Sequence, residues 1–264
     1  MEERLEIDEV MALQMAGMPV REIMRCNLDN FEHLLESNPE LNGFLNKANN
    51  ILDRQEALGI VSFSCLDERY PQRLVDIRKD APAVIHCLGN VELLKVKKAV
   101  AIIGARAADR EGNTKAYQLG KEYAEKDYVI VSGLALGCDT SAHIGCLDAG
   151  GKTVAIVGNG LDIIHPKENV TLQKRILDNG GLILSEQALG VKANPTRLVA
   201  RNRLQAALSE AVILAQCPIQ SGSLYTMEFA RKYGKQSFAA TFPRKTLANA
   251  GNYYLIENNL AKSI

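Results

Sequence analysis

The stretch from residue 99 to residue 158 decides the fold, and its first part reads AVAIIGARAADREGNTKAYQLGKEYAEKDYVIVSG (99–133). The apolar run AVAIIG (99–104) precedes a helical pattern from Gly112 to Lys126, which leads to a second apolar run, YVIVSG (128–133). The alternation continues through TVAIVG (153–158), LILSE (182–186), AVILAQ (211–216) and SFAATF (237–242). Apolar runs of strand length that alternate with amphipathic helices are typical of a parallel sheet covered on both faces. We therefore predict an α/β fold with an extended Rossmann-like, doubly wound, mostly parallel sheet.

The segments before residue 99 have a different character. Residues 1–58 read as helical, because Asp29 and Glu32 form a capping-box-like start and Pro39 opens another helical pattern. From Gly59 onward, GIVSFSC (59–65) and AVIHCLG (83–89) read as strands with proline-marked turns around them. We predict a small N-terminal helical region, residues 1–58, and an extended Rossmann-like domain over residues 59–264.

Composition excludes several classes of protein. Of the 264 residues, 47% are hydrophobic and 23% are charged, with a net charge of zero, as in an ordinary globular protein. No apolar run reaches the roughly 18 residues of a membrane span, and the acidic start MEERLEIDEV (1–10) is unlike a signal peptide. We expect a cytoplasmic protein without a membrane partner. The six cysteines form no CxxC pair, which favours buried thiols over a metal site or disulfides, and no cofactor is indicated.

The loop after the first apolar run is a candidate ligand site, because ligands of doubly wound sheets bind beyond the carboxyl ends of the strands. The loop reads GARAAD (104–109) and lacks the GxGxxG spacing, which disfavours classical NAD binding. It starts with Gly104 and carries Arg106, whose guanidinium suits bidentate contact with a phosphate. Arg106 could instead pair with a carboxylate such as Asp109.

Two further segments suit an anion. Ser221, Gly222 and Ser223 directly precede a helical pattern, so their backbone N–H groups and the helix terminus could face a phosphate. The segment 190–208 has no acid, and its cations fit either a phosphate-binding surface or a solvated face. These cations are Lys192, Arg197, Arg201 and Arg203.

The candidate loops show no catalytic set. They contain no paired carboxylates in adjoining loops, no set of serine, histidine and aspartate at converging loop positions, and no P-loop lysine after Ser221-Gly222-Ser223. His143 lies within a predicted helix, where a packed or surface histidine is the usual interpretation. Lys167 could contact a phosphate from the rim of the site or be a solvated lysine. The residues favour binding over catalysis, and we expect a protein that is not an enzyme.

The motifs together resemble the DprA/Smf family of DNA-processing proteins over about residues 59–264. They are AVAIIGAR (99–106), VIVSGLALGCDTSAH (129–143), HPKEN (165–169), ARNRLQAALS (200–209), SGSLYTMEFA (221–230) and GNYYLIENNLA (251–261). Each motif is weak alone, and the resemblance rests on their order and spacing. It implies a homodimeric protein that binds single-stranded DNA without sequence preference, protects it and helps load the RecA recombinase during natural transformation.

The resemblance also implies a set of DNA-contacting residues. These are Gly104, Arg106, Lys167, Lys192, Arg201 and Arg203, with Ser221, Gly222 and Ser223 beside them. Two positions depart from the family pattern: Leu136 replaces a basic residue of many relatives, and Gln220 replaces a lysine or arginine that often precedes the SGS turn. The winged helix that many relatives add after the last strand is also missing from this sequence. Lost phosphate contacts weaken binding, so we expect a modest DNA binder.

Two alternatives remain open from the sequence. Rossmann-type nucleotide sensors and phosphoribohydrolase-like enzymes use a glutamate shortly after a PGGxGT turn, and Glu228 stands at a comparable distance after Ser221-Gly222-Ser223. The missing PGGxGT turn makes this the weaker hypothesis. The N-terminal helices could also carry a function of their own by binding a partner.

Overall fold

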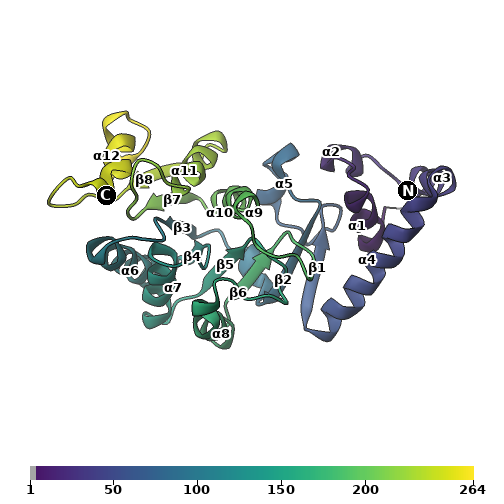
Figure 1. Ribbon diagram of the computed structural model, residues 1–264, viewed down its shortest axis with the longest axis horizontal. Coiled ribbons are helices and arrows are strands. Elements are labelled where there is room, and N and C mark those ends of the chain that lie inside the picture. Colours follow the sequence, from purple (N-terminus) through teal and green to yellow (C-terminus); the bar gives the residue numbers. More distant parts are fainter. Residues whose placement is uncertain (1–3) are drawn as a thin grey trace.

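The computed structural model describes residues 4–264 and is built around one sheet of nine strands (Figure 1). Their order across the sheet is β1-β2-β6-β5-β4-β3-β7-β8-β9. Neighbours from β6 to β9 are parallel, whereas β2 is antiparallel to both β1 and β6. The strands are β1 (Ile60–Ser64), β2 (Val84–Gly89), β3 (Ala99–Ile103), β4 (Val129–Ser132), β5 (Thr153–Val157), β6 (Leu182–Ser185), β7 (Ala211–Leu214), β8 (Gln236–Ala239) and β9 (Lys262–Ser263). The predicted fold class is confirmed, and the six apolar runs form β3 to β8.

Helices precede the sheet and connect its strands. The N-terminal helices are α1 (Ile7–Met15), α2 (Val20–Ile23), α3 (Leu28–Ser37) and α4 (Pro39–Ala57). The others are α5 (Gln72–Val75), α6 (Arg110–Glu125), α7 (Cys138–Asp148), α8 (Val170–Asp178), α9 (Pro195–Ala200), α10 (Asn202–Ala207), α11 (Ser223–Lys232) and α12 (Ala250–Glu257). The segment LVARNRLQAALS (198–209), between β6 and β7, does not form one continuous helix, because the chain turns at Arg201 and separates α9 from α10. None of the helices that the structure describes is long and apolar enough to cross a membrane.

The central strand β3 shows why helices cover both faces of the sheet. All five of its residues are buried. Val100 and Ile102 belong to a hydrophobic cluster with residues of α6 and α7, whereas Ala101 and Ile103 belong to a second cluster with residues of α10 and α11. Successive side chains of a strand point to opposite faces, so an unbroken apolar run needs a helical layer on each side.

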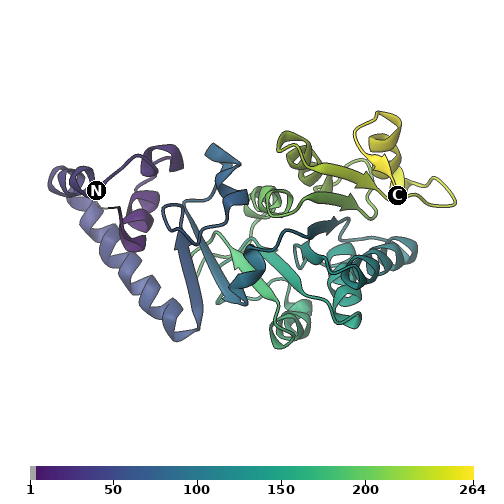
Figure 2. The ribbon, with the colours of Figure 1, turned by 180° about the vertical axis from the view of Figure 1, so that it is seen from behind.

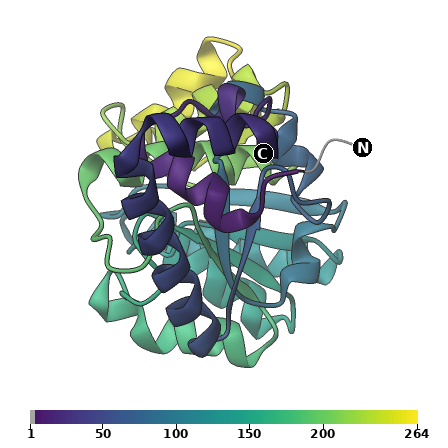
Figure 3. The same cartoon turned by 90° about the vertical axis from the view of Figure 1, so that its right-hand side faces the viewer.

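The helices α1 to α4 lie together beside β1 and β2, at one end of the sheet (Figures 2 and 3). Asn27 caps α3 by accepting a hydrogen bond from the N–H of Asn30 at 2.9 Å, so the start predicted from Asp29 and Glu32 is wrong by two residues. Pro39 does open α4, as predicted. Residues of α1 and α4 belong to the same hydrophobic cluster as β1 and β2, and the division into two domains after residue 58 stays a prediction.

The order of the strands reverses at β3, and this reversal positions the candidate site. The chain proceeds from β3 through β4 and β5 to β6 on one side, and β7 then pairs with β3 on its other side. The loops that leave β3 and β7 therefore diverge at the carboxyl edge of the sheet. Such a switch point is where doubly wound sheets leave a crevice for a ligand.

Candidate functional site

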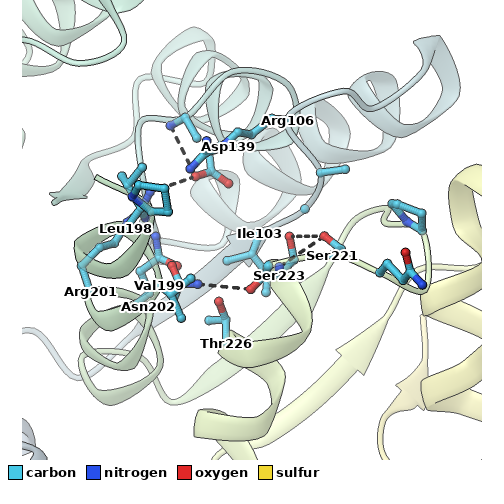
Figure 4. A pocket seen from close by; sticks show the side chains of 18 residues that line it. Ile103, Arg106, Asp139, Leu198, Val199, Arg201, Asn202, Ser221, Ser223 and Thr226 are labelled. Carbon is cyan, nitrogen blue, oxygen red and sulfur yellow. Dashed lines mark hydrogen bonds and ion pairs between the residues drawn. The ribbon is translucent and has the colours of Figure 1, made fainter. Parts of the chain in front are cut away.

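A pocket of about 420 Å³ lies at this switch point (Figure 4). The loop after β3 contributes one wall, the loop after β7 and the start of α11 contribute the second, and α9 and α10 contribute the third. Among the predicted site residues, Gly104, Arg106, Arg201, Ser221, Gly222 and Ser223 line it. Segments that are far apart in the sequence thus meet at one edge, as the strand pattern predicts.

The turn before α11 has the form of an anion-binding helix start. Gly222 is the N-cap, and the N–H of Ser223 donates to Oγ of Ser221 at 3.2 Å. Asn202 of α10 donates its Nδ2 to the carbonyl oxygen of Gly222 at 3.2 Å, which holds the turn against the opposite wall. Helix N-termini carry a partial positive charge, so this wall attracts an anion without a cationic side chain.

Arg106 provides the exposed cation of the pocket. Within residues 4–264 its guanidinium makes no ion pair and no side-chain hydrogen bond. The alternative pairing with Asp109 is not found: Asp109 caps α6 by accepting from the N–H of Gly112 at 2.8 Å, and it also accepts from Nε2 of Gln216 at 2.9 Å. The guanidinium is therefore available to a ligand with both of its N–H edges.

Arg201 forms the buried floor of the same pocket. It is 3% exposed, its Nη2 donates to the carbonyl oxygen of Gly133 at 2.9 Å, and it lies 3.9 Å from the Asp139 carboxylate. Burial, together with a smaller effect of the charge of Arg106, lowers the pKa of Arg201 to about 10 against the attraction of Asp139. Burial also raises the pKa of Asp139. Two neighbouring cations, only one of which has an acidic partner, leave the pocket electropositive.

Gly133 is required for this arrangement. A Cβ atom at residue 133 would collide with the guanidinium of Arg201. The N–H of Gly133 donates to Oδ2 of Asp139 at 3.1 Å, and the amide of Gln205 faces the same N–H and Nη1 of Arg201, which its oxygen accepts from once the amide is turned over. The sequence did not single out Gln205 or Asn202, although both are polar residues within the ARNRLQ run that carries the arginines. Gly133, in the loop after β4, therefore leaves space for the guanidinium of Arg201, and the polar face of α10 lies against it.

Arg203 does not line the pocket. Its Nη1 donates to Oε1 of Glu186 at 2.7 Å, and its Nε donates to the carbonyl oxygen of Asp80 at 2.7 Å. A third contact joins Nη1 to the carbonyl oxygen of Ala200 at 2.8 Å. Burial alone would lower the pKa of Arg203, but the contact with Glu186 raises it. With these donors used within the protein, the structure places Arg203 in a supporting role for α10.

The two predicted lysines lie outside the lining of the pocket. Lys167 is exposed and stands between Pro166 and Glu168, which line an adjoining hollow of about 250 Å³ that also contains Arg106, Arg201 and Leu136. Lys192 is exposed, and its backbone carbonyl accepts from Nη1 of Arg197 at 3.1 Å. Lys167 is thus placed to extend the electropositive surface along the rim. Lys192 does not line the pocket.

Neither a catalytic set nor a metal-binding group joins these residues. Glu228 is exposed on α11 and does not line the pocket, which removes the geometric basis of the phosphoribohydrolase-like alternative. His143 is fully buried, with Nδ1 2.7 Å from Oγ1 of Thr153, and burial lowers its pKa to about 3. It is therefore a packed histidine, as the sequence indicated. Over residues 4–264 no cluster of histidine, cysteine or acidic side chains could hold a metal ion.

A mostly parallel, doubly wound sheet with a crevice at its switch point defines the class of Rossmann-like α/β proteins. More particularly, the chain belongs to the family described as DNA recombination-mediator protein A, whose sequence profile matches residues 62–264. This confirms the DprA/Smf resemblance.

Individual relatives agree with this assignment. The crystal structure of DNA processing protein A from Streptococcus pneumoniae superimposes with a TM-score of 0.74 at 33% identity, covering 97% of this chain and 89% of that chain. A Helicobacter pylori DprA structure, whose subject is a single-stranded DNA binding mode, gives 0.68 at 33% identity over 78% of this chain and 90% of that chain. The curated DprA sequence of Streptococcus pneumoniae is 44% identical over 178 residues, which are 67% of this chain and 62% of the relative. The chain thus spans less than two thirds of that relative's length.

Proposed function

We propose that the chain binds single-stranded DNA, without sequence preference, at the switch-point pocket. The observation that carries the proposal is the convergence of Arg106, Arg201 and the Ser221–Ser223 helix start on one crevice. The relatives support it, because one of them is described by its single-stranded DNA binding mode. Binding to a phosphate backbone needs cations and N–H donors but no recognition of base edges, which fits these groups.

The roles of the residues follow from their exposure. Arg106 reaches a phosphate directly, the N–H groups before α11 hold the next, and Arg201 contributes positive potential from the floor. Gly104 keeps the β3 loop close to the wall, because a Cβ there would meet the backbone oxygen of Gln216 at 2.8 Å. Lys167 extends the path along the rim, and Lys192 and Arg203 are not needed for contact.

The wider role is that of a recombination mediator in the cytoplasm. In this proposal the protein protects single-stranded DNA, acts as a homodimer and assists loading of a RecA-type recombinase, without chemistry on the strand. Family membership supports this role, and the neutral residues Leu136 and Gln220 next to the pocket favour modest affinity. A test is whether the purified protein increases recombinase assembly on oligonucleotides that are already coated by a competing single-strand binding protein.

The binding site is tested by reversing one charge. Arg106→Glu should weaken binding to an oligothymidylate by roughly tenfold or more, and should lower the slope of log affinity against log salt by at least ~0.7, the value for one phosphate contact on a single strand. Fluorescence anisotropy over a range of salt concentrations measures both. Arg54→Glu, an exposed arginine of α4, is the matched control. Undetectable or salt-independent binding by the unmodified protein would refute the proposal.

A further inference from the structure

A second and larger hollow lies at the other end of α11. Its volume is about 1020 Å³, and its walls come from α2, from the segment 73–80 and from the end of α11. Because α11 has ten residues, this α2–α11 groove lies about 15 Å from the helix start that lines the switch-point pocket. The helices α2 and α5 lie next to each other above the sheet in Figure 1.

The lining of the α2–α11 groove is strongly basic. It contains two carboxylates, Asp76 and Asp80, and six cations. The cations are Arg21, Arg73, Arg78, Lys79, Lys232 and Lys235. This excess of positive charge lies on a chain whose total net charge is zero. The groove therefore has a higher density of positive charge than the chain as a whole.

Internal pairing accounts for only part of this charge. Lys232 forms an ion pair with Asp80, and the hydroxyl of Tyr233 donates to the same carboxylate at 2.9 Å. Burial alone would raise the pKa of Asp80, but these contacts outweigh it and hold the pKa low. Arg73 donates to the backbone oxygen of Leu208 at 2.6 Å, which leaves its charge without a carboxylate in contact. Arg21, Arg78, Lys79 and Lys235 make no ion pair within residues 4–264.

At Lys235 the neighbouring positive charge disfavours the protonated form of the side chain. Its side chain is partly buried in the groove, and burial together with the charge of Arg73 lowers its pKa. Glu210 and Asp76 oppose this effect without forming an ion pair with it. An ammonium group in this position is stabilised by an anion from outside the chain.

The backbone of the groove adds N–H donors to the cations. Ile77 has φ −82° and ψ 2°, and Arg78 follows with φ 54°, a positive value that is uncommon for a residue other than glycine. A right-handed residue followed by a left-handed one forms a nest, in which successive N–H groups line an anion-binding concavity. None of the N–H groups of residues 77 to 79 donates a hydrogen bond within the described part of the chain.

From this convergence we propose that the α2–α11 groove is a second phosphate-binding site, which takes a further stretch of the backbone of a nucleic acid strand. The inference rests on the proposed function, because the same strand would engage the switch-point pocket. The cations come from three separate elements along an open groove, which fits successive phosphates better than a single bound phosphate. Three of them are arginines, whose planar N–H forks match phosphate oxygens.

The experiment compares two double variants on a 40-nucleotide oligothymidylate. Arg78→Asn with Lys79→Gln removes two exposed charges, and asparagine tolerates the positive φ of residue 78. Lys47→Gln with Lys174→Gln removes two exposed charges elsewhere and is the matched control. We expect the groove variant to bind more weakly at low salt and to lower the salt slope by about 1.4, so that a fourfold rise in salt reduces its affinity roughly sevenfold less than it reduces the affinity of the unmodified protein. Arg21→Gln, on α2, should act in the same direction.

The outcomes separate the two proposals. If the unmodified protein binds and Arg106→Glu weakens it, but the groove variant matches its control in affinity and slope, the groove assignment is wrong and the proposed function stands. If the unmodified protein binds no oligonucleotide, the proposed function fails. Calorimetric titration with inorganic pyrophosphate distinguishes a free ligand: pyrophosphate binding that the groove variant loses, without loss of oligonucleotide binding, overturns the nucleic-acid assignment. Circular dichroism melting confirms that each variant is folded.

Discussion

Replacing Arg203 tests whether this arginine supports the fold or contacts DNA. Its side chain is 15% exposed and that of Glu186 is 11% exposed, so the pair is largely buried. Arg203→Leu leaves the Glu186 carboxylate without its partner and removes the donors to the carbonyl oxygens of Asp80 and Ala200. Breaking a buried pair from one side costs about 3–5 kcal/mol. For a chain of this size the melting temperature should fall by on the order of 10 °C.

Urea unfolding measures the loss of stability, and a double-mutant cycle with Glu186→Leu isolates the contribution of the pair. The double variant should recover much of the stability lost by Arg203→Leu, because no buried carboxylate is left unpaired. At a temperature where Arg203→Leu remains folded, the salt slope of oligonucleotide binding should equal that of the unmodified protein. A variant of unchanged stability that binds DNA with a reduced slope would refute this reasoning and assign Arg203 to the DNA-contacting surface.

Two further predictions follow from the buried residues. Gly133→Ala should destabilise the protein by about 1–3 kcal/mol and weaken oligonucleotide binding, because its Cβ would displace the guanidinium of Arg201. Gly43→Ala on α4, far from the pocket lining, is the control, because its Cβ meets nothing within 4 Å, and equal effects of the two would contradict the role of Gly133. Burial lowers the pKa of His143 to about 3 and that of His86 to about 4. Below about pH 6.5 the unfolded chain therefore binds more protons than the folded chain at these two histidines. The free energy of unfolding should fall by on the order of 2 kcal/mol per histidine between pH 6.5 and 5.0. Asp139, whose pKa is raised in the folded protein, has the opposite effect. Urea unfolding at pH 7.5 and 5.0 measures this, and equal stability at both values would contradict it.

The sequence predicts the sheet well because buried parallel strands are read from local composition. The runs that form β3 to β7 are mainly apolar and almost entirely buried, since helices cover both of their faces, whereas β8 begins with Gln236 and Ser237 and is only partly buried. The strand β9 has only two residues and leaves no such pattern. The predicted start of α3 is wrong because Asn27 and Asn30 form the capping box, with the reciprocal contacts that the sequence analysis assigns to Asp29 and Glu32.

The position of a site residue could be predicted where the residue directly follows a strand. It could not be predicted where the side chain is held by residues from distant segments of the chain. Arg106 and the Ser221–Ser223 turn follow strands of the switch point, so their positions at the carboxyl edge follow from the fold class. Arg203 lies in a segment without acids, but its partners are Glu186, 17 residues away, and Asp80, 123 residues away. The order of charges along the chain does not reveal these contacts, so the sequence could not show that the guanidinium of Arg203 is held by partners within the protein.

Asp80 connects two parts of the molecule that bind different phosphates in our proposals. Its backbone oxygen accepts from Arg203 on α10, the helix whose residues Asn202 and Gln205 line the switch-point pocket. Its carboxylate accepts from Lys232 and Tyr233 at the far end of α11, within the α2–α11 groove. A shift of α10 on binding at the pocket would therefore change how much of the charge of Lys232 is neutralised in the groove. Any such allosteric coupling is reciprocal, so a strand held at one site would change affinity at the other by the same factor.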